Sequence, residues 1–186
     1  MVIVISGPIA SGKSTIAREL ARELDRTSVR AAVIDLDLLY GMLTGDGAKS
    51  DDATWELARR AAGTLVNTLL EEGVAVVIAE GSFNILSDRA AFVQHLGAGV
   101  DPIYVTLRVS FEEALRRAQN DLTRGLSRDP GFLGPYFAAV SQALATVPVT
   151  DIVIDTERTT ATSAAAAIAS LIRAKPRSQD TIDSAP

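Results

Sequence analysis

Residues 7–15 read GPIASGKST and directly follow an apolar run at residues 2–5. The stretch fits the spacing G-x-x-x-x-G-K-[ST] at Gly7, Gly12, Lys13 and Ser14. The two glycines permit backbone angles that aim successive N–H groups inward, and the positive end of the following helix favours an anion. Lys13 would reach the β- and γ-phosphates of a nucleotide, and the Ser14 hydroxyl would bind Mg²⁺. The spacing therefore predicts a loop that holds ATP with Mg²⁺, its expected phosphate contacts being Gly7, Ala10, Ser11, Gly12, Lys13, Ser14 and Thr15.

Acidic side chains follow two further apolar runs. Asp35 and Asp37 end the run at 31–35, and Glu80 follows the run at 74–79. Ligands of open parallel sheets gather at the carboxyl ends of the strands, so these acids are candidates for the same site. Asp35 and Asp37 would point the same way if the chain stayed extended. The alternative is that Asp37 caps the short helical segment that follows it.

Glu80 has two interpretations as well. An apolar strand that ends in an acid is typical of the carboxylate that holds Mg²⁺ in phosphoryl-transfer sites, which would pair Glu80 with Ser14 as metal ligands. In the second interpretation Glu80 only ends a strand. Gly81 would let a substrate approach the backbone, and Ser82 would then lie on the substrate side.

An arginine-rich stretch lies between positions 116 and 128, at Arg116, Arg117, Arg124 and Arg128. Guanidinium groups match the geometry of phosphoryl oxygens, so Arg124 is a candidate for nucleotide binding and Arg128 for catalysis. Arg117 and Arg124 are seven positions apart and would share a helix face. The alternative for Arg116 and Arg117 is an exposed salt bridge to the glutamates four residues earlier.

Apolar, β-branched runs alternate with helical stretches along the chain, which indicates an α/β fold with a parallel sheet. Ser110 and Glu113 have the spacing of a capping box. We expect one domain over residues 1–174 and a disordered tail at 175–186. Strands are expected at 2–6, 31–35, 74–79, 102–108 and 151–155, and helices near 13–25, 52–72, 87–96, 111–123, 133–146 and 160–174.

Composition excludes several classes of protein. The chain has 186 residues, a net charge of −5, no cysteine and one histidine. The absence of cysteine rules out disulfides, thiolate nucleophiles and Cys-bound zinc. The acidic balance argues against nonspecific binding to nucleic acid or to an anionic membrane. The N-terminus has no basic segment before its short apolar run, so we expect a cytoplasmic protein, as a monomer or homodimer.

The phosphate loop and its flanking elements resemble the P-loop nucleoside-triphosphatase superfamily. The letters SGKST are most similar to small-molecule kinases of the gluconate, adenylylsulfate and chloramphenicol phosphotransferase types. This resemblance implies a three-layer α/β/α fold with a five-stranded parallel sheet in the order 2-3-1-4-5. It also implies a mobile lid at about 115–135, and it places residues 151–159 near the adenine.

The resemblance implies an ATP-dependent transfer of the γ-phosphate to a hydroxyl of a small molecule. Asp37 aligns with the residue that receives the acceptor's proton, and Asp35 is second. An antibiotic is one candidate acceptor, and a sugar acid or a nucleotide is the alternative. A non-catalytic nucleotide sensor is the competing class, whereas the guanine motif of a GTPase switch is absent. The apolar stretch 36–43 favours a neutral acceptor, and the residues expected to line its site are Asp35, Asp37, Tyr40, Glu80 and Ser82.

Overall fold

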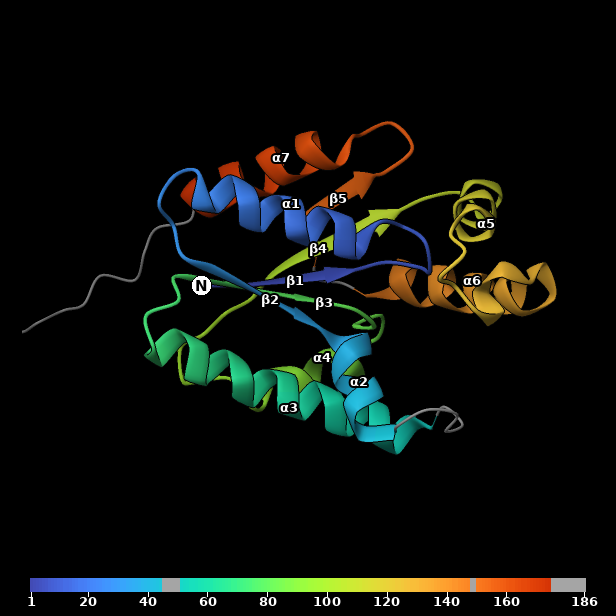
Figure 1. Ribbon diagram of the computed structural model, residues 1–186. Coiled ribbons are helices and arrows are strands. Elements are labelled where there is room, and N and C mark those ends of the chain that lie inside the picture. The colour runs from blue at the N-terminus through green and yellow to red at the C-terminus, as the bar shows by residue number, and fades with distance from the viewer. Residues whose placement is uncertain (45–50, 148–149, 175–186) are drawn as a thin grey trace, which may run out of the picture.

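A computed structural model describes residues 1–44, 51–147 and 150–174. Its centre is a five-stranded, all-parallel sheet in the order β2-β3-β1-β4-β5 (Figure 1). The predicted strand order is therefore confirmed. The strands are β1 (Val2–Ser6), β2 (Ala31–Asp35), β3 (Val76–Glu80), β4 (Ile103–Arg108) and β5 (Ile152–Asp155).

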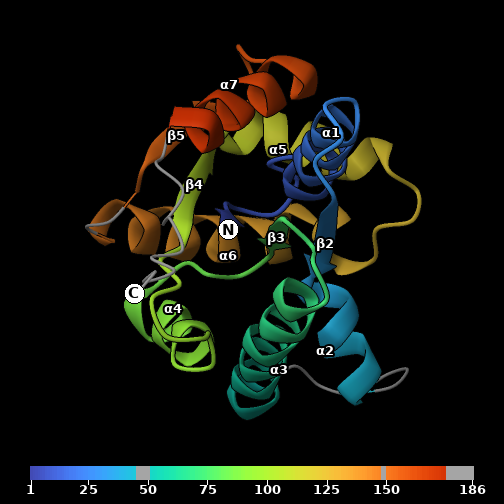
Figure 2. The ribbon, with the colours of Figure 1, turned by 90° about the vertical axis from the view of Figure 1, so that its left-hand side faces the viewer.

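Helices cover both faces of this sheet, which confirms the predicted three-layer fold. In Figures 1 and 2, α1 and α7 lie on one face, and α3 and α4 lie on the other. The helices α2, α5 and α6 gather around the carboxyl ends of the strands (Figure 1). The helices are α1 (Lys13–Asp25), α2 (Leu36–Thr44), α3 (Asp52–Glu71), α4 (Leu86–Val93), α5 (Phe111–Asn120), the 3-10 turn η1 (Leu126–Arg128), α6 (Pro130–Thr146) and α7 (Ala161–Ala174).

The central strand β1 contributes to two separate cores. Ile3 and Ile5 pack with α1 and α7, whereas Val2 and Val4 pack on the opposite side with α3 and α4. Successive side chains of a strand point to opposite faces, so an unbroken apolar run is what a strand covered on both sides requires. The burial of β1 fixes the start of the phosphate loop at the middle of the sheet.

Several boundaries differ from those predicted. Helix α2 begins at Leu36, immediately after β2, and strand β3 runs on to Glu80. Helix α5 ends at Asn120, so Arg124 lies beyond it and the predicted shared helix face of Arg117 and Arg124 is wrong. Helix α6 begins earlier than predicted, at Pro130, because Asp129 caps it and proline suits a first helical turn.

The predicted capping box at the start of α5 is half formed. The Ser110 hydroxyl accepts a hydrogen bond from the backbone N–H of Glu113. The Glu113 carboxylate binds Arg116 and Arg117 instead of reaching back, and the Ser110 N–H donates to Glu157. The side chain of Glu113 is therefore used for salt bridges within α5, and the tertiary contact at this helix start is the one from Ser110 to Glu157.

Within the described residues, no helix has both the length and the apolar character needed to cross a bilayer. The predicted tail at 175–186 lies outside the described residues.

Candidate active site

The loop between β1 and α1 has the conformation that the phosphate-loop prediction requires. Gly12 takes a left-handed backbone with φ of 94°, which glycine adopts without steric cost. Helix α1 begins at Lys13 with no side-chain cap on its first amides. These amides and the dipole of α1 are therefore available to an anionic ligand.

Gly7 is needed for a different reason from the one predicted. Its φ lies outside the positive range. A Cβ at Gly7 would instead lie 2.7 Å from the Ser11 hydroxyl and 3.0 Å from the Cβ of Leu107. Close packing against Ser11 of the same loop and Leu107 of β4 therefore excludes a side chain at Gly7.

Lys13 lies across its own loop. Its ammonium donates hydrogen bonds to the carbonyls of Gly7 at 3.1 Å and Pro8 at 3.2 Å. Burial lowers the pKa of Lys13, and the carboxylates of Asp37 and Glu80 oppose that shift. A nucleotide phosphate would supply a stronger partner than two neutral carbonyls.

The pairing of the strands brings Asp35 and Glu80 to one place. Both Ile5 of β1 and Asp35 of β2 are aligned with Glu80 of β3. The Glu80 side chain is buried, with 2% of the residue exposed, and it hydrogen-bonds the Ser14 side chain. Burial raises the pKa of Glu80 to about 7, and the Ser14 hydrogen bond opposes the shift. The predicted metal ligands Ser14 and Glu80 are therefore in contact.

Ser14 and Glu80 fit a magnesium ion that arrives with a nucleotide. Mg²⁺ is usually held by one or two protein oxygens, phosphate oxygens and water. In the described part of the chain, no group of three or more His, Cys, Asp or Glu side chains could hold a metal by itself. A hydroxyl and one carboxylate beside the phosphate loop match the smaller donor set of a Mg–nucleotide complex.

Asp35 and Asp37 have different roles in the structure, and the predicted extended chain between them is wrong. The Asp35 carboxylate accepts hydrogen bonds from the backbone N–H groups of Asp37 at 2.9 Å and Leu38 at 3.4 Å. Asp35, not Asp37, thus caps α2. Asp37 lies in the first turn of that helix, where Lys13 is the cation that most lowers its pKa. Loss of solvent outweighs Lys13, so the pKa of Asp37 is raised overall.

The sequence predicts that Gly81 lets a substrate approach the backbone, but the structure leaves no room for one there. Its φ is 145°, and a Cβ there would lie 2.6 Å from the Cβ of Leu36. The close neighbour of the Gly81 backbone is therefore the start of α2. This contact fixes α2 against the end of β3.

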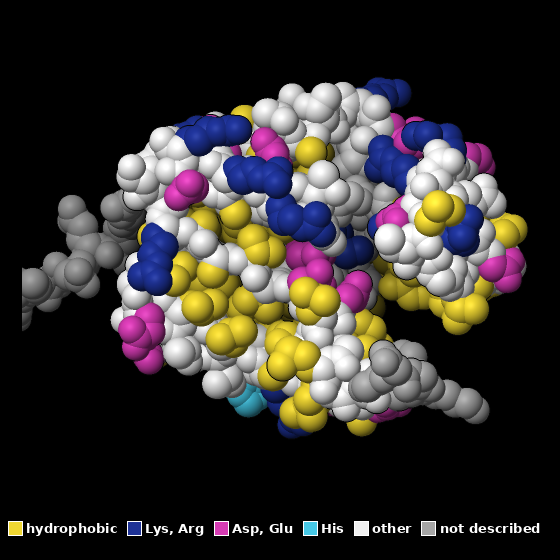
Figure 3. Space-filling model, in the orientation of Figure 1, with side chains coloured by type: hydrophobic (Ala, Val, Ile, Leu, Met, Phe, Trp, Pro, Cys, Tyr) yellow, Lys and Arg dark blue, Asp and Glu magenta, His cyan; other side chains and the backbone are white. Residues whose placement is uncertain are grey.

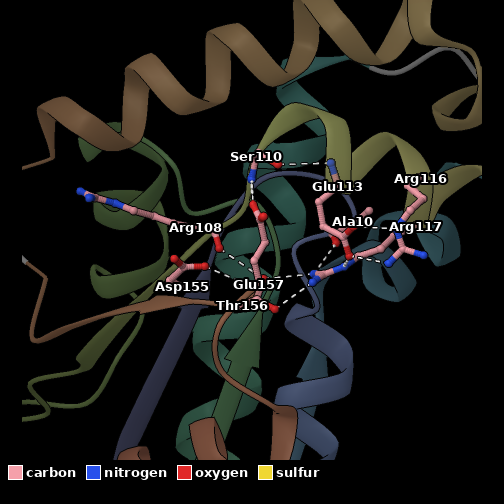
Figure 4. Close-up of polar contacts among 9 residues, drawn as sticks. All are labelled: Ala10, Arg108, Ser110, Glu113, Arg116, Arg117, Asp155, Thr156 and Glu157. Carbon is pink, nitrogen blue, oxygen red and sulfur yellow. Dashed lines mark hydrogen bonds and ion pairs between the residues drawn. The ribbon is translucent and has the colours of Figure 1, made fainter.

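Arg117 joins three segments that are far apart in sequence (Figure 4). It binds Glu113 in its own helix at 2.7 Å, the Ala10 carbonyl of the phosphate loop at 3.4 Å, and both the hydroxyl and the carbonyl of Thr156 after β5. Neighbouring Arg116 binds Glu113 alone. The exposed salt bridge expected of Arg116 is present, although its partner is Glu113, three residues earlier, and not Glu112. For Arg117 the salt bridge to Glu113 is one of four contacts.

A cavity of about 360 Å³ opens beside the phosphate loop. Arg117 and Arg124 line it together, although they do not share a helix. Arg124 is ion-paired with Asp121 at 3.1 Å. Arg128 is exposed at the end of η1 and is not part of this lining. The other lining residues are Ala10, Ser11, Gly12, Thr15, Ile16, Asp121, Thr156, Thr159, Thr160 and Ala161.

A second group of polar side chains lies on the other side of Asp37, and sequence reasoning missed most of it. Arg59 of α3 forms an ion pair with Asp88 at 3.0 Å and donates to the Ser82 carbonyl at 3.0 Å. The Tyr136 hydroxyl of α6 lies near the Ser82 side chain. We call Arg59, Ser82, Asp88 and Tyr136 the acceptor wall, because we propose below that they face the acceptor. An ion pair between separate helices leaves no local pattern in the sequence. The one signal in the sequence was that Arg59 falls on the apolar face of its helix.

Tyr40 and Trp55 lie next to this wall. Their rings stack with centroids 4.0 Å apart, and the guanidinium of Arg59 lies 6.0 Å from the Trp55 ring. The Tyr40 hydroxyl accepts a hydrogen bond from the N–H of Asp51 at the start of α3. Tyr40 thus has a structural contact, and its predicted contact with substrate stays a prediction.

Figure 3 shows a cleft between the lobe of α5 and α6 and the part of the molecule that carries α2 and α3. Basic and acidic side chains meet at its inner end, and hydrophobic side chains lie along the underside of the α5–α6 lobe. The cleft therefore offers a charged end for phosphates and less polar rims.

A sequence family described as the AAA domain matches residues 2–125. That match covers most of the chain. The chain belongs to the AAA domain family. The matched part of this AAA domain contains the phosphate loop, Asp37, Glu80, Arg117 and Arg124, whereas Arg128, Tyr136 and Thr156 lie beyond it. A search of curated protein sequences gives no significant match.

Many solved structures share the fold of this AAA domain. The structure of APE1195 has a TM-score of 0.73 and 23% identity, covering 94% of this chain and 95% of its own. An APS kinase from Mycobacterium tuberculosis, solved with AMPPNP and APS, has a TM-score of 0.67 and 19% identity, covering 92% and 96%. Shikimate kinase from Acinetobacter baumannii, solved with shikimate, has a TM-score of 0.62 and 24% identity, covering 92% of each chain. The predicted likeness to P-loop small-molecule kinases is thereby confirmed for the fold.

Proposed function

We propose that this chain is an ATP-dependent phosphotransferase that moves the γ-phosphate of ATP to a hydroxyl of a small molecule. The observation that carries the proposal is the electrostatic interaction between Asp37 and Lys13. Each of these two groups shifts the pKa of the other, although one starts the helix after β1 and the other follows β2. A carboxylate facing the lysine of a phosphate loop is placed to receive a proton next to the γ-phosphate.

In the proposed reaction, each residue of the site has a separate role. The amides of the phosphate loop and Lys13 would hold the phosphates, and Ser14 with Glu80 would hold Mg²⁺, which neutralises phosphate charge when bound. The acceptor oxygen forms a bond to the γ-phosphorus as the bond from that phosphorus to the β–γ bridging oxygen breaks. Asp37 takes the proton that the acceptor hydroxyl loses, and ADP leaves with the bridging oxygen.

We propose separate roles for the two arginines of the predicted lid. Arg124 lines the nucleotide cavity and acts on Lys13 and Asp37 electrostatically, so it would neutralise charge at the phosphates. The predicted catalytic role of Arg128 requires the η1 segment to move toward the phosphate loop. Closure of this kind would exclude water, which otherwise competes with the acceptor.

The acceptor is proposed by chemical class. An alcohol of the antibiotic type, a sugar acid and a nucleotide remain the candidates that the phosphate loop allows. The structural neighbours act on APS and shikimate according to their descriptions, which makes these two compounds sensible probes. The cytoplasm and a monomeric or homodimeric state remain predictions.

The test is a screen for ADP release with Mg-ATP against antibiotics, sugars, sugar acids, shikimate, APS and nucleosides. We expect one class of alcohol to stimulate ADP release and to appear as its phosphate ester by mass spectrometry. Lys13→Ala should abolish the stimulation, because it removes the charge that balances the transferred phosphate. ATP binding without turnover for every acceptor would favour a nucleotide sensor instead.

A further inference from the structure

The charge of Arg59 is already neutralised on the acceptor wall. Arg59 is 9% exposed, and its guanidinium binds the Asp88 carboxylate and the Ser82 carbonyl. The second carboxylate oxygen of Asp88 accepts from the backbone N–H of Asn84 at 3.1 Å, which holds the carboxylate in place. An anionic substrate would have to displace a buried, doubly anchored partner to reach Arg59.

Further carboxylates surround this ion pair. Asp52 and Glu56, both exposed on α3, act electrostatically on Arg59, and Asp37 acts on the hydroxyl of Tyr136. The cations on the phosphate side, Lys13 and Arg124, are committed to the nucleotide under the proposed function. Among the described residues in and around the wall, carboxylates therefore outnumber the cations that could meet an acceptor.

Tyr136 supplies the wall with an uncharged polar group. Its hydroxyl lies near the Ser82 side chain, two residues beyond β3, and close enough to Asp37 to interact with it electrostatically. Its ring stacks with Phe132 one turn earlier in α6, at 6.5 Å between centroids, and Phe132 is exposed. A hydroxyl pair next to an exposed aromatic ring suits an alcohol with a less polar face rather than an anion.

We infer that the acceptor is an alcohol without an anionic group, and that Tyr136 orients it for transfer. This inference rests on the proposed kinase function and deepens it. The ion pair between Arg59 and Asp88 gives the wall its selectivity, because it occupies the guanidinium that a carboxylate or phosphate would need. Asp37 and Asp52 add repulsion toward an anion.

Matched pairs of acceptors test this selectivity. The probes are methyl shikimate against shikimate, glucose against gluconate, and 1-phenylpropane-1,3-diol against 3-hydroxy-3-phenylpropanoate, each with Mg-ATP. We expect the neutral member of any pair that turns over to have a kcat/KM at least about tenfold higher. An anionic member with the higher kcat/KM overturns this inference and leaves the kinase function intact. If no alcohol in these pairs or in the broader screen stimulates ADP release, the kinase function fails and the inference fails with it.

Two variants test the residues. Asp88→Asn should raise kcat/KM for the anionic probe relative to its neutral partner by about tenfold, since Arg59 becomes available. The matched control Asp52→Asn removes a nearby charge without freeing Arg59 and should change that ratio far less. Equal ratios in Asp88→Asn and wild type would overturn the inference, and the wild-type pairs decide it if Asp88→Asn does not fold.

Tyr136→Phe separates orientation of the acceptor from general structure. We expect KM for the neutral acceptor to rise about tenfold, while KM for ATP stays unchanged, because Tyr136 does not line the nucleotide cavity. An unchanged acceptor KM, or an equal rise in both KM values, would contradict the role given to Tyr136.

Discussion

At the scale of single residues, the separate roles of Asp35 and Asp37 follow from where β2 ends. Asp35 is the last residue of the strand and binds the free amides of α2. Helix formation starts between the two acids, and Asp37, in the first turn of α2, interacts electrostatically with Lys13. The two carboxylates are two positions apart, yet one stabilises a helix and the other faces the phosphate loop.

Asp37→Asn should lower kcat by about 10²- to 10⁴-fold, the usual contribution of a general base. Nucleotide affinity should be nearly unchanged, because the phosphate loop is intact. Steady-state kinetics together with calorimetric titration of an ATP analogue will measure both. Full turnover in Asp37→Asn would show that another group receives the proton, and Asp35→Asn is the matched variant for that case.

At the scale of elements, Arg117 connects α5 to the phosphate loop and to the segment after β5. Its partners Glu113, Ala10 and Thr156 come from three elements, and Figure 4 shows them converging on one guanidinium. A planar guanidinium spreads five donors over a rigid fork and can reach acceptors on several sides, whereas the three donors of an ammonium lie on one nitrogen. One side of the cavity beside the phosphate loop is therefore held together by Arg117.

Arg117→Ala should lower the free energy of unfolding by about 1–3 kcal/mol, because half-buried acceptors lose their donor. It should also raise KM for ATP, since Arg117 lines the nucleotide cavity. Arg116→Ala is the matched control, because Arg116 binds the same Glu113 from an exposed position. If the two variants have equal effects in urea denaturation and ATP kinetics, Arg117 does not stabilise the junction between α5, the phosphate loop and the segment after β5.

The packing of α3 on α4 depends on the absence of a side chain at Gly63. A Cβ there would lie 2.5 Å from the Phe92 carbonyl and 2.9 Å from the Cβ of His95. Gly63→Ala should therefore destabilise the protein by about 1–3 kcal/mol. Gly41→Ala, in a helix with open space around it, should be neutral or stabilising by up to about 1 kcal/mol. Thermal denaturation of both variants checks the contrast, and equal shifts would contradict it.

At the scale of the whole molecule, the parallel sheet collects groups that are distant in sequence. Lys13 and Asp37 follow β1 and β2, Glu80 ends β3, and these neighbouring parallel strands end at the same edge. The helices on both faces of the sheet exclude solvent from Glu80, and this burial raises its pKa to about 7. Folding therefore works against the charge of the carboxylate that is expected to bind Mg²⁺.

The stability of the whole chain should reflect this conflict. The folded protein holds the Glu80 proton more tightly than the unfolded chain, because the pKa rises from 4.5 to about 7. The free energy of unfolding should thus fall as pH rises through that range, by on the order of 1–3 kcal/mol for this group. Glu80→Gln should remove this loss and be the more stable protein at pH 8, while binding Mg-ATP more weakly.

Thermal melts of wild type and Glu80→Gln between pH 5 and 8 will measure the difference. The gap between the two proteins should widen with rising pH. Parallel pH profiles would show that Glu80 is not buried in this way.

Local sequence was sufficient for the phosphate loop and for most elements. The apolar run of β1, Gly12 and the Lys13 helix start each depend on neighbours in the chain, so periodicity and spacing identified them. The strand order came from the resemblance to P-loop kinases, which the loop's letters supported. The ends of β3 and α5 were less accurate because tertiary contacts, such as Leu36 against Gly81, set where an element stops.

The acceptor wall and the Arg117 junction could not be predicted in the same way. Arg59, Ser82, Asp88 and Tyr136 belong to separate elements, and each alone looks like an ordinary surface or helix residue. The sequence by itself thus predicts the proposed phosphate donor, because phosphate binding uses the backbone of one short continuous loop. The proposed selection of the acceptor depends on the tertiary structure, because it requires side chains from distant elements to meet. Whether Arg59 could attract an anion, for example, depends on the ion pair that it forms with Asp88.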